Sequence, residues 1–370
     1  MKETGSLPLT KVLRGLPASV PFVGPEALER LNGRPIEVRV GANESAFGIS
    51  PRAREAMLAA VGELCLYNDP ENFDLAAALA VHHRIDPGEI CISAGVDDLL
   101  GLMVRILVEA GSPVVTSRGS YPTFDYHVRG FGGRLEQVPY AGARVDLQGL
   151  LDRAAETGAH LVYVANPDNP MGTWHSGAEI RAFVDALPQR CIAIVDEAYN
   201  DFAPAGTALP GEPADCRAVR MRTFSKAHGM AGARVGYAIA PADLVAALEK
   251  VRNHFGVNRV AQAGALASLE DPGFTAGVAG QVAAGRREYG QLAAELGLAA
   301  VPSAANFVCF DIGAPEEARR VLEELLQRGV FVRMPSSPPQ SRCIRVTVGT
   351  GPQRAAFARA LREILEESRR

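Results

Sequence analysis

Short apolar runs alternate with stretches of helical periodicity through much of the chain. Runs rich in Val, Ile and Ala occur at 89–93, 112–117, 160–166, 191–199, 218–225 and 233–240. Between them, apolar residues recur at three- and four-residue spacing, for example from Leu100 to Val108, near 176–187 and from Leu244 to Val251. Continuous apolar strands that alternate with helices are typical of a mostly parallel sheet covered on both faces. The pattern therefore predicts an α/β fold with a three-layer large domain.

The pattern changes from about residue 270 onward. Long helices rich in Ala, Glu and Arg are expected there, with a few strands in "NFVCFD", "VFVRM" and "CIRVTVG". A chain of 370 residues can bury one large core and a smaller one. We expect an N-terminal arm (1–40) that joins the small domain, a large domain (41–265) and a small α+β domain (266–370).

Composition narrows the function classes. Hydrophobic residues make up 47% of the chain, and its net charge of -4 gives no basic footprint for a nucleic acid. The six cysteines form no C-x-x-C pair, and several lie in apolar runs, so we expect reduced core cysteines and no metal site. We find no signal peptide and no apolar run of membrane-spanning length. We therefore expect a cytoplasmic protein without a membrane partner.

Unusual polar residues follow three of the predicted strands. Asn169 lies in "NPDNPMG" after 160–166, Asp196 and Tyr199 lie in "DEAY", and Lys226 follows 218–225. Open α/β sheets bind ligands beyond the carboxyl ends of their strands. Each motif alone would ordinarily be a turn or a solvated loop. Because all of them end strands of one sheet, we expect these four side chains to converge on one crevice.

An anion site is expected beside this crevice. Gly95 follows the strand at 89–93 and can start a helix whose backbone N–H groups favour an anion. Thr223, Ser225 and Arg234 can add hydroxyl and guanidinium contacts to the same anion. No G-x-G-x-x-G, P-loop or G-x-S-x-G motif is present, which disfavours hydride transfer, ATP use and serine hydrolysis.

At these residues the sequence resembles the pyridoxal-phosphate aminotransferases of fold type I, classes I and II. The resemblance covers nearly the whole chain, and within the family it is strongest to histidinol-phosphate aminotransferases. The segments that carry it are "GANESAFG" (41–48), "LYNDP" (66–70), "SAGVDDLL" (93–100), "YPTFDYH" (121–127), "NPDNPMG" (166–172), "DEAY" (196–199) and "SKAHGMAGARVGY" (225–237). It implies an aspartate-aminotransferase-like large domain and the cofactor pyridoxal 5'-phosphate.

The resemblance also implies roles at the cofactor ring. Lys226 would bind the cofactor covalently and then move the substrate's α-proton, chemistry that suits a partly desolvated amine. Asp196 would pair with the pyridinium nitrogen. Asn169 and Tyr199 would hydrogen-bond the ring's phenolic oxygen, and Phe124 would stack on the ring. These roles match the chemistry that the converging side chains already indicate.

The family's remaining positions give the phosphate and substrate contacts. Tyr67 would reach the cofactor phosphate from a second subunit, which implies a homodimer with shared active sites. Arg345 would clamp the substrate's α-carboxylate, Arg333 would help to bind a distal phosphate, and Asn43 would contact the substrate. The remaining phosphate ligands would be Thr223, Ser225, Arg234 and the amides of Gly95 and Val96. The chain departs from the family pattern at Ala46, Asn68, Met171 and His228.

The function implied is a transaminase that serves histidine biosynthesis. The expected partners are small molecules, with L-histidinol phosphate as the amino donor and 2-oxoglutarate as the 2-oxo acid. The sequence leaves open an aromatic amino-acid transaminase and a decarboxylase of a phosphorylated amino acid such as threonine phosphate. A non-catalytic cofactor-binding regulator is disfavoured, because the short N-terminal region is not basic and has no room for a DNA-binding segment.

Overall fold

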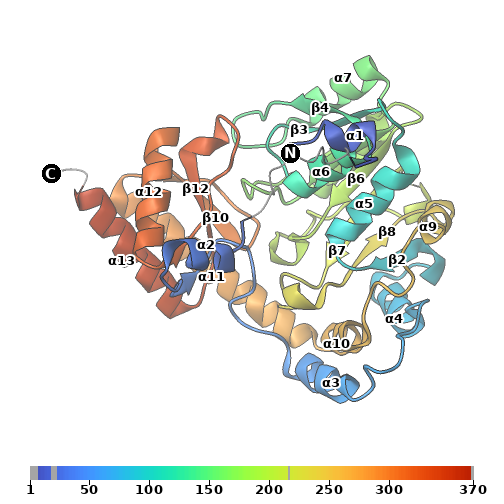
Figure 1. The fold of residues 1–370 in the computed structure, drawn as a ribbon, viewed down its shortest axis with the longest axis horizontal. Coiled ribbons are helices and arrows are strands. Elements are labelled where there is room, and N and C mark those ends of the chain that lie inside the picture. The colour runs from blue at the N-terminus through green and yellow to red at the C-terminus, as the bar shows by residue number, and fades with distance from the viewer. Residues whose placement is uncertain (1–6, 18–22, 216, 368–370) are drawn as a thin grey trace, which may run out of the picture.

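The computed structural model describes residues 7–17, 23–215 and 217–367. The described chain forms a large lobe, in which helices surround a sheet, and a smaller lobe that contains the C-terminal helices and strands (Figure 1). The segments that carry the predicted site residues come from both lobes, so the contact between them matters for function.

The large lobe contains a seven-stranded sheet. All neighbouring strands are parallel except β8, which is antiparallel to both of its neighbours. The strands, in spatial order, are β2 (Ile90–Ser93), β8 (Gly236–Ile239), β7 (Ala218–Thr223), β6 (Ile192–Asp196), β5 (Leu161–Ala165), β3 (Pro113–Ser117) and β4 (Arg134–Val138). The predicted mostly parallel sheet is confirmed. Strand β4 was not predicted, because this edge strand is only partly buried and lacks a continuous apolar run.

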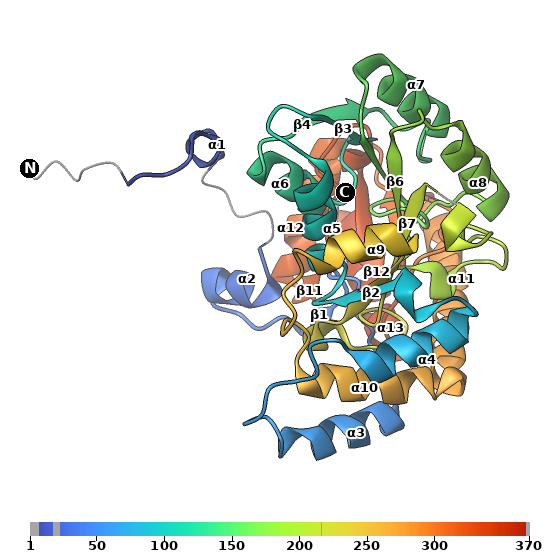
Figure 2. The same ribbon diagram turned by 90° about the vertical axis from the view of Figure 1, so that its right-hand side faces the viewer.

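Helices cover both faces of this sheet (Figure 2). Strand β5 shows the division, since Leu161 and Tyr163 face one core while Val162 and Val164 face the other. The first core includes α5 (Val96–Leu107), α6 (Pro122–Gly130) and α9 (Ala242–Glu249). The opposite face is covered by α7 (Leu147–Thr157), α8 (Gly177–Ala186), α4 (Phe73–His83) and α10 (Arg259–Leu269), with α3 (Pro51–Val61) against α10. The three-layer prediction is confirmed.

Local sequence signals set several helix starts. Gly95 is the N-cap of α5 with φ +91°, a backbone conformation that suits glycine, so the predicted helix start is confirmed. Helix α8 begins with a capping box between Ser176 and Glu179. Asn258 and Asp271 accept backbone N–H groups at the starts of α10 and the long α11 (Pro272–Leu296).

The smaller lobe combines the C-terminal elements with the N-terminal segment. Strands β12 (Cys343–Thr347), β10 (Phe307–Asp311) and β9 (Ala299–Ala300) form an antiparallel sheet, and β1 (Val38–Arg39) pairs with β11 (Val330–Phe331). The helices of this part are α2 (Pro25–Asn32), α11, α12 (Pro315–Gln327) and α13 (Gly351–Glu367), whereas α1 (Lys11–Arg14) contacts α6 of the large lobe. Val40 shares a core with residues of α11, α12 and α13, as expected for an arm that joins the small domain. Helix α10 continues past residue 265 on the large lobe. We retain the three-part division at residues 40 and 265 as a proposal.

Other general features concern cysteines, membranes and metals. Cys91, Cys191 and Cys309 are buried and unpaired, and Cys216 lies outside the described residues. Across the described ranges, no helix has the length and apolar character needed to cross a membrane. Within the same ranges, no group of three His, Cys, Asp or Glu side chains is placed to hold a metal ion.

A buried ion cluster joins the two strands that end at the predicted site. Glu197, fully buried directly after β6, accepts bonds from Arg220 (3.2 Å) and Arg222 (2.8 Å), both on β7. The Leu209 amide donates a further bond to Glu197 at 2.9 Å. The two arginines hold the pKa of the Glu197 carboxyl below its usual range, although burial opposes them. The cluster therefore fixes the end of β6 against β7.

Removing this carboxylate should destabilise the fold. Glu197→Ala removes the carboxylate acceptor of Arg220 and of the Leu209 amide, and it leaves Arg222 with only a 3.9 Å contact to Asp201. We expect the free energy of unfolding to fall by roughly 3–5 kcal/mol. Urea unfolding of the ligand-free protein measures the change. The control is Glu295→Ala, which breaks an exposed ion pair with Arg362 and should change stability far less. Equal losses in the two variants would contradict the importance of the cluster.

Candidate active site

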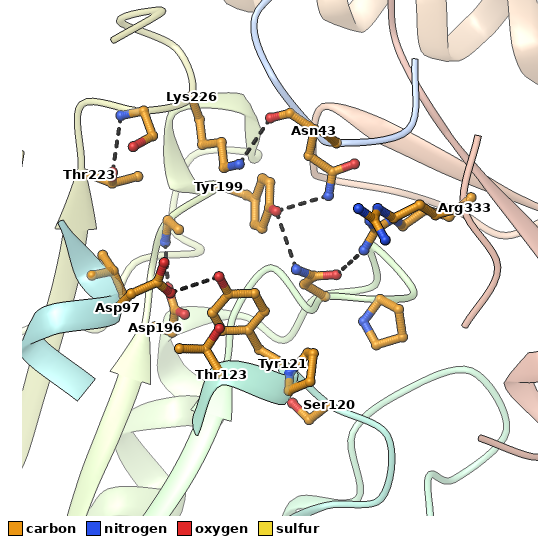
Figure 3. Close-up of a pocket in the computed structure, with 18 of the residues that line it drawn as sticks. Asn43, Asp97, Ser120, Tyr121, Thr123, Asp196, Tyr199, Thr223, Lys226 and Arg333 are labelled. Carbon is orange, nitrogen blue, oxygen red and sulfur yellow. Dashed lines mark hydrogen bonds between the residues drawn. The ribbon is translucent and has the colours of Figure 1, made fainter. Parts of the chain in front are cut away.

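A cavity of about 560 Å³ lies at the carboxyl ends of the central strands, between the two lobes (Figure 3). Figure 3 shows Lys226, Asp196, Tyr199 and Asn43 around one space. The predicted site residues that line it are Asn43, Val96, Asn169, Asp196, Tyr199, Thr223, Ser225, Lys226, Arg234, Arg333 and Arg345. The convergence expected from the strand ends is confirmed.

Asp196 ends β6 with its carboxylate buried at 6% exposure. Tyr163 Oη donates to Asp196 Oδ2 at 2.8 Å, and the Ala198 amide donates to Oδ1 at 3.0 Å. Burial raises the pKa of the Asp196 carboxyl to about 6, although these two bonds lower it. The site therefore presents a carboxylate in a fixed orientation that gains from a cationic partner.

Lys226 lies three residues beyond the end of β7, in a tight turn. The hydroxyl of Thr223 accepts the Ser225 amide at 3.0 Å, which turns the chain toward the cavity. Gly229 has φ +73°, and a Cβ there would lie 1.8 Å from the Gly48 carbonyl oxygen, so this close approach requires glycine. Lys226 Nζ donates to the Asn43 carbonyl at 3.0 Å. The amine is half-buried and directed into the cavity.

A chain of hydrogen bonds crosses from the large lobe to the small one. The Tyr199 hydroxyl accepts bonds from the Nδ2 atoms of Asn43 (3.0 Å) and Asn169 (3.4 Å). Asn169 Oδ1 in turn accepts from Arg345 Nη1 at 2.5 Å. Thr347 holds Asn43 in place. Its hydroxyl accepts a bond from the backbone N–H of Asn43 and donates one to Asn43 Oδ1. This chain keeps the Tyr199 phenol beside Lys226, whose Nζ lies 5.5 Å from the phenol ring centroid.

Two guanidinium groups line the cavity on the side of the small lobe. Arg333 and Arg345 form a backbone bridge, and both side chains line the space. Arg345 stacks 5.2 Å from the Phe307 ring, and its buried Nε has no hydrogen-bond partner within the described structure. Burial, aided by the neighbouring Arg345 charge, lowers the pKa of Arg333. A planar anion would find two forked donors here.

The opposite end of the cavity can cradle a second anion. Arg234 and Ser225 lie beside the start of α5, with Arg234 Nη1 3.5 Å from Ser225 Oγ. A Cβ on Gly95 would come within 2.6 Å of the Arg234 guanidinium, so only glycine leaves this space open. Asp97 lies 3.5 Å from Arg234 and also accepts the Tyr121 hydroxyl at 2.7 Å. Backbone N–H groups at a helix start, with a guanidinium and hydroxyls, suit a phosphate.

The predicted placement of Phe124 is wrong. Phe124 is fully buried in α6, does not line the cavity, and stacks on Tyr163 with ring centroids 4.7 Å apart. Tyr121, the N-cap of α6, lines the cavity instead. Proline at the first helical position is a sequence signal that Tyr121 lies at a helix start, where side chains face a strand-end crevice. Tyr163 was not predicted from the sequence either. The sheet register pairs Ala165 with Asp196, and Tyr163 lies two residues earlier on the same face of the sheet, where its hydroxyl reaches the Asp196 carboxylate.

The loop that presents Asn169 is held by its neighbour Asp168, which sequence reasoning also missed. Asp168 accepts the Met171 amide and the Tyr140 hydroxyl, each at 2.9 Å. Burial raises the pKa of the Asp168 carboxyl to about 7. Met171, one of the departures from the family pattern, is buried in the core against Cys309. It packs the loop against the small lobe and does not line the cavity.

The remaining predicted residues lie elsewhere. Tyr67 is 81% exposed and does not line the cavity of its own chain. Its neighbour Asn68 donates to the Asp69 carbonyl at 3.3 Å. His228 binds Ser268 at 2.7 Å and stacks beside Phe224, in a turn where no helix begins. These contacts give His228 a packing role in the turn that carries Lys226.

Comparisons with known proteins extend over nearly the whole chain. A sequence model of the family Aminotransferase class I and II matches residues 35–364. Histidinol-phosphate aminotransferase 2 of Carboxydothermus hydrogenoformans is 33% identical over 363 residues, covering 96% of this chain and 99% of that protein. Histidinol-phosphate aminotransferase 2 of Methylococcus capsulatus is 35% identical, covering 89% of this chain and 90% of that protein.

Solved structures agree with this result. Histidinol-phosphate aminotransferase from Sinorhizobium meliloti, in complex with pyridoxal-5'-phosphate, superposes with a TM-score of 0.94 at 45% identity, covering 99% of each chain. A Thermus thermophilus aspartate aminotransferase mutant gives a TM-score of 0.81 at 21% identity, covering 98% of this chain and all of that one. At that identity the second likeness concerns the fold alone, and it confirms the aspartate-aminotransferase-like prediction.

Replacing Asp196 with the neutral isostere should stabilise the ligand-free protein at alkaline pH. The carboxyl titrates near 3.8 when unfolded and near 6 when folded. The folded state therefore binds more protons within this window, and stability falls as pH rises through it. Above about pH 6, Asp196→Asn should be more stable than the wild type by roughly 2–3 kcal/mol. Below about pH 4 this advantage should vanish.

Urea unfolding of both proteins from pH 4 to pH 8 measures this difference. The Asp168 carboxyl titrates in both proteins, and most of its contribution cancels, because the Asp196 charge is the smallest of the causes that shift its pKa. A difference that is independent of pH would contradict the assignment of the shifted carboxyl to Asp196.

Proposed function

This chain belongs to the class I and II aminotransferases, and we propose that it is a pyridoxal-phosphate-dependent transaminase with L-histidinol phosphate as amino donor and 2-oxoglutarate as acceptor. The observation that carries the proposal is the meeting of a buried carboxylate, Asp196, and an amine, Lys226, in one cavity. Relatives named histidinol-phosphate aminotransferase support the donor. Histidine biosynthesis in the cytoplasm is the setting that this reaction implies.

The residues of the cavity fit pyridoxal phosphate. The carboxylate of Asp196 is buried and gains from a cation, as a protonated pyridine nitrogen provides. The space beside Gly95, which a Cβ would fill, suits the phosphate, with Arg234 as its guanidinium. The Tyr121 ring provides an aromatic surface at the wall of the cavity. A ring with a basic nitrogen and an attached phosphate satisfies both ends.

Each of these side chains then has a definite task. When bound, pyridoxal phosphate supplies an aldehyde that exchanges amines and a cationic ring that withdraws electrons from the carbon bearing the amino group. Asp196 would keep a proton on the ring nitrogen. Lys226 Nζ would hold the aldehyde and, as a free amine, would carry the proton of the substrate carbon. The Tyr199 hydroxyl and Asn169 Nδ2 donate to the ring's phenolic oxygen.

The phosphate and the substrate use opposite ends of the cavity. We propose that the Val96 amide and the hydroxyls of Thr223 and Ser225, together with Arg234, hold the cofactor phosphate. The Gly95 amide, which was also predicted as a ligand, donates instead to the Ser93 carbonyl at 2.7 Å. Arg345 and Arg333 lie at the other end. In glutamate the reacting carbon bears a carboxylate, and in histidinol phosphate it bears a phosphorylated hydroxymethyl group. Arg345 can bind either anion, Arg333 adds a second guanidinium for the phosphate of histidinol phosphate, and Asn43 borders the same space, so one site can serve both half-reactions.

A homodimer with shared active sites is part of the proposal. Tyr67 is 81% exposed and lies outside its own cavity, so its hydroxyl is available to another chain. The Phe255 ring lies 5.0 Å from it, and further apolar side chains of the neighbouring sequence are exposed, namely Leu58, Val61, Leu64, Leu66 and Phe73. Burying such a patch against a second copy would remove it from water and bring Tyr67 toward the partner's cofactor phosphate.

Loss of the amine tests the core of the proposal. In Lys226→Ala we expect no borohydride-reducible bond between protein and cofactor, and turnover reduced by at least about a thousandfold, because both the covalent attachment and the proton carrier are lost. Mass spectrometry after borohydride treatment and a coupled assay of glutamate formation measure these effects. The control is Lys250→Ala, at the C-cap of α9, which should retain both. A reducible adduct in Lys226→Ala would overturn the assignment.

Replacing Arg345 and replacing Arg333 should affect the KM values of the amino donors differently. Arg345→Gln should raise the KM for both histidinol phosphate and glutamate. Arg333→Gln should raise the KM for histidinol phosphate by roughly 10- to 100-fold, the loss of one charge-assisted contact, and that for glutamate much less. Steady-state kinetics with histidinol phosphate, phenylalanine and glutamate measure the split. Phenylalanine as the preferred wild-type donor, or carbon dioxide release without use of a 2-oxo acid, would overturn the proposed reaction.

A further inference from the structure

The segment 66–72, which we call the Tyr67 segment, joins the region after α3 to the start of α4. Asp69 shapes it from within, since its carboxylate accepts the Glu71 amide at 3.0 Å and the Phe73 amide at 2.7 Å. Asn72 adopts a left-handed backbone conformation with φ +54°. The segment is therefore an ordered loop, and it holds out the exposed Tyr67 ring.

Side chains far along the sequence bind the backbone of this segment. Arg259 Nη2 donates to the Tyr67 carbonyl at 2.7 Å, and Gln262 Nε2 donates to the Asp69 carbonyl at 2.9 Å. Arg252 Nη2 donates to the Pro70 carbonyl at 2.9 Å. All three come from 252–262, at or just before the start of α10, and Figures 1 and 2 both show α3, α4 and α10 side by side. The Tyr67 segment is thus held from one side at three carbonyls.

Arg259 is the contact closest to the tyrosine. Its guanidinium spans two elements, since Nη1 donates to Glu63 at 2.8 Å while Nη2 binds Tyr67 O. Its Nε is buried without a hydrogen-bond partner in the described structure. The Tyr67 ring lies 5.0 Å from Phe255, which belongs to the same supporting stretch. Fixing the carbonyl of Tyr67 limits the directions that its side chain can take from the backbone.

We propose that Arg259, assisted by Gln262, is a positioning residue that acts on the cofactor site of the partner subunit by fixing Tyr67. The inference rests on the proposed function, in which Tyr67 reaches the phosphate of the other chain. Arg259 does not line the cavity of its own chain. An exposed aromatic side chain on an unsupported loop loses conformational freedom when it binds, and a loop that is already held avoids most of that cost.

The direction of this effect separates positioning from a general structural role. If Arg259 acts through Tyr67, its loss weakens cofactor binding in the subunit that does not carry the substitution. If Arg259 only supports the fold of its own chain, its loss weakens cofactor binding in the subunit that carries the substitution. Heterodimers that contain a single Lys226 report on one site at a time, because only that site forms the borohydride-reducible bond.

The test uses two heterodimers, isolated through two different affinity tags. In the first, a wild-type chain pairs with a Lys226→Ala, Arg259→Ala chain, so the only Lys226 faces a Tyr67 without its support. In the second, an Arg259→Ala chain pairs with a Lys226→Ala chain, so the only Lys226 faces a supported Tyr67. The readouts are the pyridoxal phosphate dissociation constant, from absorbance titration, and the rate of cofactor release.

We expect the first heterodimer to bind pyridoxal phosphate roughly 5- to 30-fold more weakly than a wild-type/Lys226→Ala heterodimer, less than the loss of a direct charge-assisted contact, because Arg259 acts only through the position of Tyr67. The second should match that reference. Tyr67→Phe in place of Arg259→Ala should reproduce the same pattern. Glu63→Gln, which removes only the ion pair, should change affinity little, and Arg259→Lys should restore part of it.

Three results would overturn the inference alone: equal weakening of cofactor binding in both heterodimers, weakening that follows the Arg259→Ala substitution on the Lys226-bearing chain, or wild-type affinity in both. Failure of the wild-type protein to form dimers, or to form a reducible bond with pyridoxal phosphate, would overturn the proposed function itself.

Discussion

Burying the Asp196 carboxylate at the end of a strand costs free energy. The rest of the site depends on the contacts that stabilise this buried charge. Tyr163 and the Ala198 amide donate hydrogen bonds to the carboxylate but bring no positive charge, so a cation placed beside it would stabilise it further. The adjacent strand β7 leads to Lys226. Glu197, held by arginines of β7, fixes the relation between the two strand ends. In the proposed function, a cationic ring nitrogen would pair with Asp196 and an aldehyde with Lys226, each at a fixed position.

The second constraint is the hydrogen-bond chain that joins the lobes. Arg345 comes from the small lobe, and Asn43 comes from the segment that joins the lobes and is bonded to Thr347 of the small lobe. Tyr199 and Asn169 come from the large lobe, and each side chain contacts the next. Lys226 also binds the Asn43 carbonyl, so the amine is linked to the same chain. A shift of one lobe against the other would therefore alter the substrate end and the reacting end of the cavity together. This coupling favours a substrate that binds both lobes.

The sequence was sufficient wherever one strand or one turn determines the position of a side chain. Asp196, Asn169 and Lys226 follow buried strands of a parallel sheet, and Gly95 starts a helix, so their places followed from local pattern and fold class. The prediction for Phe124 failed because it lies three positions after Tyr121 at the start of α6. Tyr121 lines the cavity, whereas Phe124 is buried in the core. Tyr163 and Asp168 are set by register and by contacts across the fold, which no local pattern contains.

The distribution of charge explains how one cavity can accept two different donors. Arg234 lies at one end and the Arg333–Arg345 pair at the other, and the Asp196 carboxylate also lines the cavity. A molecule that meets all of these groups would place anions at both ends and a cation at Asp196. In the proposed function the cofactor phosphate would occupy the Arg234 end, so the substrate's anion would be directed to the other. Because guanidinium groups bind carboxylate and phosphate oxygens by the same forked geometry, the remainder of the donor is discriminated by the walls between the ends, where Tyr121 and the Asn43 segment lie.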